Sequence, residues 1–451
     1  MEGLYLRCCD IDVHKKVLVA CVIQVIDGQR HKEIRTFATT TQGILQLLDW
    51  LQATGCTHVA MESTGVYWKP IYNLLEGHFQ LLVVNAQHIK AVPGRKTDVR
   101  DAEWIADLLQ HGLLKASFIP PAPQRELREL TRYRVSLVQE RARTVNRLQK
   151  TLEDTNIKLG DVATDILGKS ARAMLEALLA GQTDPVLLAD LARGRMKAKR
   201  AQLEEALVGT VKPHHRFMLS EELVLIDTLD EAIERISQEI AQRLDPPPDP
   251  TERGESSAGQ IKPDQRAQPP ADRSASHQLQ DAQGLCWKDA VVLLDSIPGI
   301  NQRAAEGILA EIGIDMSRFP TAGHLASWAG MCPGNHESAG KRLKGSMRKG
   351  SPWLRQLLVE AAHAAAHTKN TYLSSLYHRI KARHGAKQAM MAVGHAILVI
   401  CYHMLDRHVA YQDVGGNYFD EHEQQAVEKR LVRRLEKLGY EVSLQPVTHV
   451  A

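Results

Sequence analysis

A segment that cannot form a hydrophobic core divides this chain into two parts. Residues 245–284 begin DPPPDPTERGESS and are rich in Pro, Ser, Gln and charged residues, with no aromatic residue. Such a composition cannot bury enough apolar surface to offset the entropy of an ordered chain. We therefore expect a disordered Pro-rich linker at 245–284, between an N-terminal part and a C-terminal domain that starts near Leu285.

The bulk composition argues against a membrane-spanning protein and against a disulfide-bonded one. The 451 residues are too many for one core and enough for two or three domains. The seven cysteines are odd in number, scattered and without a C-x-x-C pair, which fits a reducing compartment. No run of eighteen apolar residues and no signal-peptide cleavage site is found, so we expect a cytoplasmic protein with no membrane partner. A formal charge of +3 indicates no partner by itself, but the basic residues are clustered.

Residues 4–111 alternate strand and helix signals. Hydrophobic periodicity predicts three strands with short connections, and then helix, strand, helix, strand and helix. The expected strands are 4–11, 17–25, 33–39, 58–62 and 79–84, and the expected helices are 42–53, 67–76 and about 98–111. RNase H-like α/β domains have this order.

Four acidic residues fall where such a sheet would bring them together. Asp12 lies at the end of the first expected strand, and Glu62 ends the short strand in HVAMES. Asp98 and Asp101 are three residues apart and so share one face of the last helix. Carboxylates gathered at one edge repel each other unless cations neutralise them, and two Mg²⁺ ions would also stabilise the attacking and leaving oxygens of a phosphodiester. We therefore predict a catalytic Mg²⁺ site at these four residues.

Two neighbouring acids remain open as alternatives for this site. Asp10 is two residues before Asp12 and can share its face of the strand, and Asp107 lies further along the last helix.

A long basic helix is expected after the first domain. Between Arg125 and Lys150 there are eight basic and three acidic residues, and leucines recur at helical spacing over 124–160. The helical pattern resumes at about 171–243. One interpretation is a helical hairpin or coiled coil that packs or dimerises. A second, compatible interpretation is that the arginine face also contacts nucleic-acid backbone.

The C-terminal part opens with two helical patterns around a tight turn, IPGI at 297–300. This is typical of a helix-hairpin-helix, whose turn amides bind a phosphate. An ordinary helix pair that only packs is the alternative.

A basic loop with a serine follows. From Ser338 to Arg355 there are six basic residues and no acidic residue, and glycines punctuate the run before a helix that starts near Pro352. Such a loop suits phosphate contact, and backbone and cations there could stabilise charge on a phosphorus attacked by Ser338. The basic residues are Lys341, Arg342, Lys344, Arg348, Lys349 and Arg355. Ser346 and Ser351 are the alternative serines.

The motifs CDIDVHKK, MESTGVYWKP, KTDVRDA, IPGI, AGMCPGNHESAGKR and GSMRKGSPWLR together resemble the DEDD-type transposases of insertion sequences, which are bridge-RNA-guided recombinases. The resemblance covers about residues 5–160 and 285–410. It implies that the four acids form a RuvC-like Mg²⁺ site and that Ser338, in its S-x-G pattern, is the nucleophile of a covalent phosphoserine intermediate. This sequence departs from the common pattern of the family at Ala339, where many relatives carry a second serine, and in its long linker.

The resemblance also implies partners and a domain plan. The partners would be donor and target DNA, an element-encoded guide (bridge) RNA, and further copies in a dimer or tetramer whose subunits complete each other's sites. Lys96 and Arg100, beside the acids, would join the basic loop in binding nucleic acid. The plan is a RuvC-like DEDD domain at 1–118, a helical coiled-coil arm at 119–244, the linker at 245–284, a mostly α-helical C-terminal transposase domain with the catalytic serine at 285–415, and a helical tail at 416–451.

Other functions are weighed against this one. A RuvC-like structure-specific nuclease would need no covalent intermediate, and a non-catalytic nucleic-acid scaffold would need no metal. Glu360, His363 and His367 lie on one helix face, but without the H-E-x-x-H pattern we expect packing or RNA contact there and not zinc.

Overall fold

The chain forms two compact units, which divide between Pro120 and Pro121. The structure is a computed structural model that describes residues 4–63, 65–85, 101–245, 284–332, 336–338, 341–343, 350–422 and 424–443, with backbone alone at 101–102, 336–338, 341–343 and a few residues of 420–430. The linker expected at 245–284 lies almost entirely outside the described residues.

The first unit contains a five-stranded mixed sheet in the order β3-β2-β1-β4-β5. Strands β1 to β3, the three strands expected with short connections, form an antiparallel meander, and β4 and β5 add to it in parallel with β1. The strands are β1 (Arg7–Val13), β2 (Val17–Ile26), β3 (Gln29–Ala38), β4 (His58–Glu62) and β5 (Gln80–Val84). The α/β prediction is confirmed, although β1 starts at Arg7 and not at Leu4, which is 66% exposed.

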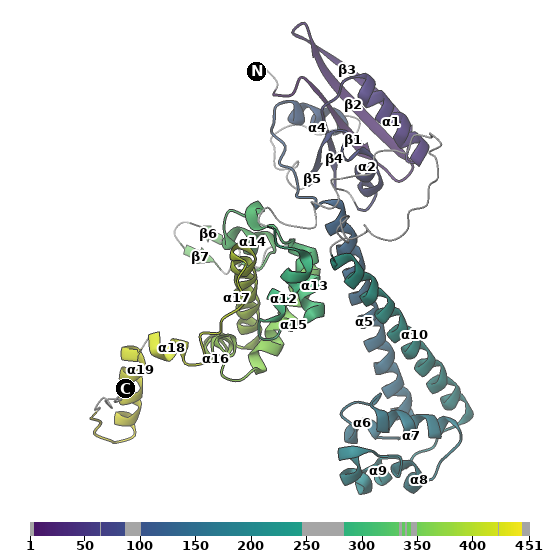
Figure 1. Cartoon of the computed structure of the whole chain (residues 1–451), viewed down its shortest axis with the longest axis vertical. Helices are drawn as coiled ribbons and strands as arrows, with labels where there is room; N and C mark the ends of the chain where they lie inside the picture. Colours follow the sequence, from purple (N-terminus) through teal and green to yellow (C-terminus); the bar gives the residue numbers. More distant parts are fainter. Residues whose placement is uncertain are drawn as a thin grey trace, which may run out of the picture. The chain divides into compact units, whose positions relative to one another are not determined.

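Side chains alternate between the two faces of this sheet, and each face has its own core. On one face Cys9, Ile11 and Val13 pack under α1 (Thr41–Ala53) and α2 (Trp68–Leu75). On the other face Cys8, Ala60 and Val84 pack under α4 (Asp101–Gln110). Figure 1 shows the three helices around the sheet.

The second unit begins with a long helical hairpin made of α5 (Ala122–Asp154) and α10 (Pro213–Leu244). Leu127 shares a core with Leu244, whereas Leu152 at the other end of α5 shares a core with Leu219, so the two helices run antiparallel. The hairpin is therefore observed, while coiled-coil packing within it stays a prediction.

Short helices close the far end of the hairpin, which we call the tip (residues 155–212). Here the helical pattern expected at 171–243 breaks up, because Gly181 and Gly194 adopt positive φ and Pro185 starts a new helix; the pattern resumes only at Pro213, where α10 begins. The tip contains α6 (Leu159–Val162), α7 (Lys169–Leu179), α8 (Pro185–Ala189), the 3-10 helix η2 (Gly194–Lys199) and α9 (Arg200–Ala206).

The C-terminal domain of this unit is mostly helical, as expected. Its core helix is α17 (Ala386–Arg407), which packs against α14 (Ala322–Trp328), α15 (Pro352–His367) and α16 (Tyr372–His384). The other elements are α12 (Trp287–Asp295), α13 (Gln302–Ile312), η4 (Met316–Arg318), β6 (His336–Ser338), β7 (Lys341–Leu343), α18 (Tyr418–His422) and α19 (Gln424–Lys437).

Among the described helices, α17 alone is long and apolar enough to cross a membrane by length and composition. Half of that stretch is buried, and Val393, Ile397 and Leu398 are fully enclosed by the domain core. A core helix of a globular domain has these properties.

Buried ion pairs join α5 to α13. Arg134 Nη1 lies 2.6 Å from Glu306 Oε2, and both side chains are at most 5% exposed. Arg132 makes two bonds to Glu311, of 2.6 and 2.9 Å, and Arg128 donates to the carbonyl oxygen of Glu311 at 2.7 Å. Burial lowers the pKa of Arg128 to about 10, against the opposing effect of Glu311. The interpretation of this arginine face as a nucleic-acid surface is wrong for these three residues, because acids distant in the sequence occupy them.

The hairpin turn at 297–300 lies against α15. Gly299 has φ +91°, and a Cβ there would lie 2.4 Å from the Ala361 carbonyl oxygen and 2.6 Å from the Ala365 amide nitrogen. This close packing is sufficient to require glycine, so the phosphate-binding interpretation of the turn stays a prediction.

Removing one partner of the buried Arg134–Glu306 pair should strongly destabilise the second unit. Glu306→Gln leaves a buried guanidinium without its counter-charge, and such losses cost about 3–5 kcal/mol. The matched control is Arg243→Gln, which breaks exposed pairs with Glu126 and Glu239 and should cost less than about 1 kcal/mol. Urea unfolding of both variants measures the difference, and equal losses would show that the buried pair is not an anchor.

Candidate active site

The central strand β1 places its acids on the face covered by α4. Asp10 and Asp12 alternate with the core residues Cys9, Ile11 and Val13, so both acids point away from α1 and α2. Asp10 is fully buried, whereas the Asp12 side chain is 33% exposed. Asp12 is therefore the acid on β1 that a substrate could approach.

Strand pairing brings Glu62 beside Asp12. Strands β1 and β4 are parallel, with Ile11 opposite Met61. The next position on each strand is Asp12 and Glu62, and adjacent strands are about 4.8 Å apart. Glu62 is half-buried and ends β4. The two carboxylates expected from the sequence thus lie side by side at the carboxyl ends of neighbouring strands.

The remaining two acids lie on or before α4. Helix α4 begins at Asp101, whose side chain is not described, and it packs on β1 and β2. Asp98 lies outside the described residues, together with Lys96 and Arg100. In the described part of the chain, no three His, Cys, Asp or Glu residues gather as metal ligands. The described part of the predicted site is therefore one pair of carboxylates, which are ligands that a hard divalent cation prefers.

His14 is a neighbour of Asp12 that the sequence reasoning missed. Its Nε2 lies 3.0 Å from Asp12 Oδ2, and its side chain is 60% exposed. The signal was present in CDIDVHKK, because Asp10, Asp12 and His14 follow the period of two that puts them on one face. The contact gives Asp12 a hydrogen-bond partner that can hold its carboxylate in place.

The two alternative acids have other positions. Asp107 forms an ion pair with Arg30 of β3, and Glu103 pairs with Lys32 at 2.5 Å, so this side of α4 is tied to β3. Asp10 lies two residues before Asp12, enclosed beneath α4. Asp10 is thus enclosed, and the carboxylate of Asp107 is engaged by Arg30.

Buried thiols adjoin the acidic face. Burial raises the pKa of Cys8 to about 12 and that of Cys21 to about 11. Both thiols stay protonated at neutral pH, and the thiolate is the form that attacks or binds metal. The chemistry of this face therefore belongs to the carboxylates.

Ser338 ends a short strand in the second unit. Strand β6 pairs antiparallel with β7, and Ser338 is opposite Lys341 across a two-residue connection. The backbone of Ser338 is extended, directly before the connection of this hairpin. Lys341 and Arg342 share this hairpin, whereas Lys344, Arg348 and Lys349 lie outside the described residues, as does the alternative Ser346.

Close packing holds together the two ends of the segment that carries Ser338. A Cβ on Gly350 would lie 2.1 Å from the carbonyl oxygen of Ala329. Half-buried Arg355 donates from Nη2 to the Gly330 carbonyl oxygen at 3.4 Å. Arg355, which was expected to bind nucleic acid, thus has a structural contact at the base of the loop.

The other alternative nucleophile, Ser351, is engaged in the fold. Its Oγ caps α15 by accepting from the Leu354 amide, and it donates to Glu311 Oε2 at 3.0 Å. Because Glu311 also binds Arg132, one buried carboxylate connects α5 to the start of α15.

The histidines of α15 show local contacts. The rings of His363 and His367 are 4.7 Å apart, and Glu360 accepts a hydrogen bond from Gln356. All three side chains are exposed, so this helix face does not pack into the domain, and RNA contact there stays a prediction.

Models of two transposase families match the two parts of the chain. Residues 9–157 match a transposase family of the DEDD, IS110 type, and residues 291–378 match the transposase IS116/IS110/IS902 family. The first range contains the four acids, and the second contains Ser338. Both ranges agree with the resemblance drawn from the motifs.

Two curated relatives share a shorter region. The pilin gene-inverting proteins of Moraxella lacunata and Moraxella bovis are each 31% identical over 106 residues, which are 21% of this chain and 32% of the relative. The chain thus spans about a third of the length of these relatives. The two matched ranges follow each other in the expected order, so over both of them the chain is similar to IS110-type transposases.

Proposed function

We propose that this chain exchanges DNA strands through a covalent bond between DNA and Ser338, and that the reaction also needs a divalent cation. The observation that carries the proposal is the pairing of Asp12 with Glu62 on the face beneath α4, with Asp101 at the start of that helix. Asp98 would complete the ligand set. The cation, which we expect to be Mg²⁺, would neutralise charge on the phosphodiester oxygens.

The covalent step conserves the phosphodiester. Ser338 Oγ would attack the phosphorus, forming a P–Oγ bond while the P–O bond to the departing deoxyribose breaks. The serine proton is lost and the departing oxygen gains one. A hydroxyl of a second strand then reverses the step at the same phosphorus. Because no phosphodiester bond is hydrolysed, strand exchange by this route requires no nucleoside triphosphate.

The hairpin of β6 and β7 supports this assignment of the serine. Pairing sets Lys341 opposite Ser338 and Arg342 one position further on, so two cationic residues share the short hairpin of the nucleophile. Cations beside the attacked phosphate would stabilise its negative charge.

We propose further that donor and target DNA are the substrates and that an element-encoded guide RNA selects them. The support is the match of both domains to IS110-type transposases and the basic segment that includes Lys344, Arg348 and Lys349. The names of the Moraxella relatives state that they invert a pilin gene, which is a DNA rearrangement. A homo-oligomer, dimer or tetramer, is part of the same proposal.

The metal proposal predicts a ligand-dependent stability. Mg²⁺ should raise the thermal unfolding temperature of the wild-type chain, because a ligand at a hundred times its Kd stabilises by about 2.7 kcal/mol. Asp12→Ala and Glu62→Ala should lose this increment, and these variants, together with Asp98→Ala and Asp101→Ala, should lose strand transfer. Asp49→Ala, on α1 at the opposite face, is the control and should keep both. A full Mg²⁺ increment in Asp12→Ala would remove that residue from the site.

The serine proposal predicts a trapped adduct. A reaction denatured midway should contain DNA attached to protein through phosphoserine, and Ser338→Ala should abolish the adduct while preserving DNA binding. Ser351→Ala is the matched control, since its hydroxyl contacts Glu311. No adduct with wild type, or an undiminished one with Ser338→Ala, would favour a RuvC-like nuclease that uses water.

The basic loop predicts a salt-dependent affinity. Charge reversal at Arg342, Arg348 or Lys349 should weaken nucleic-acid binding, and each lost phosphate contact should reduce the slope of log affinity against log salt by about 0.9. Titrations at several salt concentrations measure this slope. An unchanged slope in all three variants would mean that the loop does not contact phosphate.

A further inference from the structure

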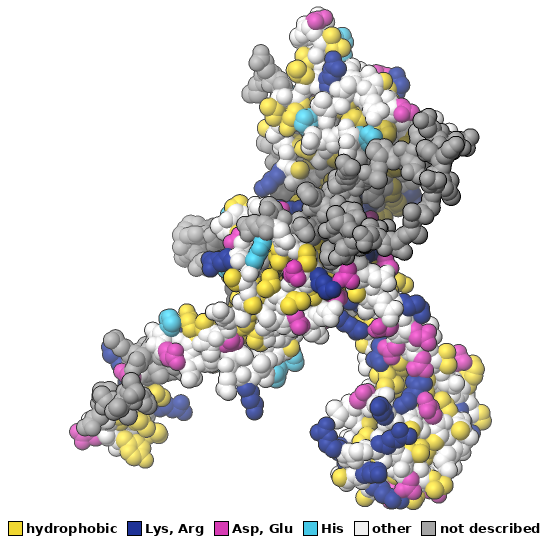
Figure 2. All heavy atoms as spheres, in the orientation of Figure 1, with side chains coloured by type: hydrophobic (Ala, Val, Ile, Leu, Met, Phe, Trp, Pro, Cys, Tyr) yellow, Lys and Arg dark blue, Asp and Glu magenta, His cyan; other side chains and the backbone are white. Residues whose placement is uncertain are grey.

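A second basic surface lies at the far end of the helical hairpin. Residues 193–200 read RGRMKAKR and contain five basic residues and no acidic residue. The segment forms η2 and the residue on each side of it. Figure 2 shows Lys and Arg side chains gathered over this end of the hairpin.

Three cations of this segment are exposed and lack an ion pair within the described residues. Arg193, Arg195 and Lys197 are all exposed, and none of them has a carboxylate within ion-pair distance. Arg200 differs, because it pairs with Asp190 at 2.7 Å and with Glu204 at 2.8 Å. The fold thus neutralises one end of the segment and leaves the other end charged.

The tip holds this segment by two polar contacts. The Arg193 amide donates to Ser170 Oγ at 2.9 Å, and Lys199 Nζ donates to the Val162 carbonyl oxygen at 2.8 Å. The first contact puts Arg193 beside the start of α7, where Lys169 is also exposed. We call Lys169, Arg193, Arg195 and Lys197 the tip strip.

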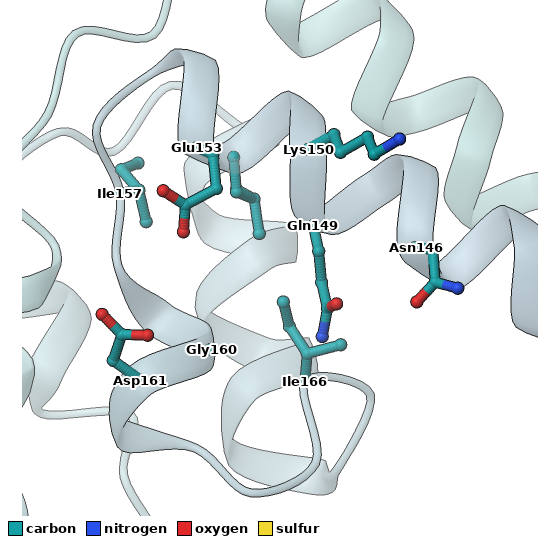
Figure 3. A pocket seen from close by; sticks show the side chains of 9 residues that line it. Asn146, Gln149, Lys150, Glu153, Ile157, Gly160, Asp161 and Ile166 are labelled. Carbon is teal, nitrogen blue, oxygen red and sulfur yellow. The ribbon is translucent and has the colours of Figure 1, made fainter.

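The pocket in the same tip has a different chemistry. It has a volume of 460 Å³ and lies between the end of α5 and the α6 region (Figure 3). Its lining includes two carboxylates, Glu153 and Asp161, against one cation, Lys150, and the amide of Gln149. Carboxylates repel phosphate, so the tip strip and not this pocket is suited to a polyanion.

We infer that the tip strip binds the phosphate backbone of double-stranded DNA outside the site of strand exchange. Unpaired cations held at fixed spacing gain free energy by releasing counterions from a polyanion. Residues 193–200 lack an aromatic side chain on which an unpaired base could stack, which favours a duplex over a single strand. The inference rests on the proposed function only in taking DNA as the substrate.

The length of α5 sets the distance between the tip and the C-terminal domain. Arg132 is anchored to α13, and Leu152 belongs to the core of the tip, so roughly 30 Å of helix separates them. One turn of B-DNA is about 34 Å long. A contact at the tip would therefore engage phosphates about one turn away from those at the C-terminal domain and would fix the direction of the duplex.

The test uses the full chain and a duplex of random sequence with about four helical turns. The variant Arg193→Gln/Arg195→Gln/Lys197→Gln should reduce the salt slope by about 2.7 and the affinity at 0.1 M salt by at least about tenfold. The matched control is Lys369→Gln/Arg383→Gln/Lys387→Gln, which removes three exposed cations of the C-terminal domain. It should leave the slope nearly unchanged. Arg193→Lys/Arg195→Lys keeps the charge and should bind like wild type.

Every outcome decides the inference. An unchanged slope in the strip variant, or an equal loss in the control variant, overturns it. A loss confined to an RNA hairpin of equal charge also overturns it and makes the strip an RNA surface. The strip variant keeps Ser338 and the four acids, so it should still form the phosphoserine adduct. If the adduct forms and the salt slope is unchanged, the inference about the tip strip fails while the proposed function stands.

Discussion

Two buried carboxylates on α13 organise the second unit. Glu306 and Glu311 are each 2% exposed, and a charge at such depth is tolerated only with a hydrogen-bonded counter-charge. Arg134 and Arg132 of α5 supply these charges. The hairpin is therefore attached to the C-terminal domain at specific residues and not only by an apolar seam. Because Glu311 also accepts from Ser351, the same carboxylate sets where α15 begins, directly after the segment that carries Ser338.

The first unit depends on a simpler constraint, the alternation of side chains along β1. Ile11 and Val13 fill the core under α1 and α2, so Asp10 and Asp12 must project to the other face. Parallel pairing with β4 then brings Glu62 next to Asp12. The ion pairs from Arg30 and Lys32 hold α4 over this face and bring the position of Asp101 to it. The acidic site is thus a consequence of register, and a shift of one residue would move the acids into the apolar core.

Basic residues serve two different purposes in the second unit. Along α5, four arginines pair with acids from other elements: Arg128 and Arg132 with Glu311, Arg134 with Glu306, and Arg141 with Asp230 at 2.5 Å. At the tip, Arg193, Arg195 and Lys197 have no such partner among the described residues. Counting charges along the sequence cannot distinguish these cases, because the neutralising acids lie far away in the chain. Burial and pairing, and not basic content, identify the surface that is available to a polyanion.

The sequence by itself determined the α/β character of residues 4–111 and the order of strands and helices along the chain, and it made Asp12 and Glu62 candidates, because a period of two and a period of 3.6 are local properties of the chain. Its motifs also indicated the transposase family. Only the tertiary structure decided that His14 contacts Asp12, that Asp10 is enclosed, that Ser351 caps a helix, and that Arg128, Arg132 and Arg134 belong to an internal interface. Each of these facts depends on contacts between segments that are distant in sequence or on the depth of a side chain within a core, and a pattern of residue types contains neither.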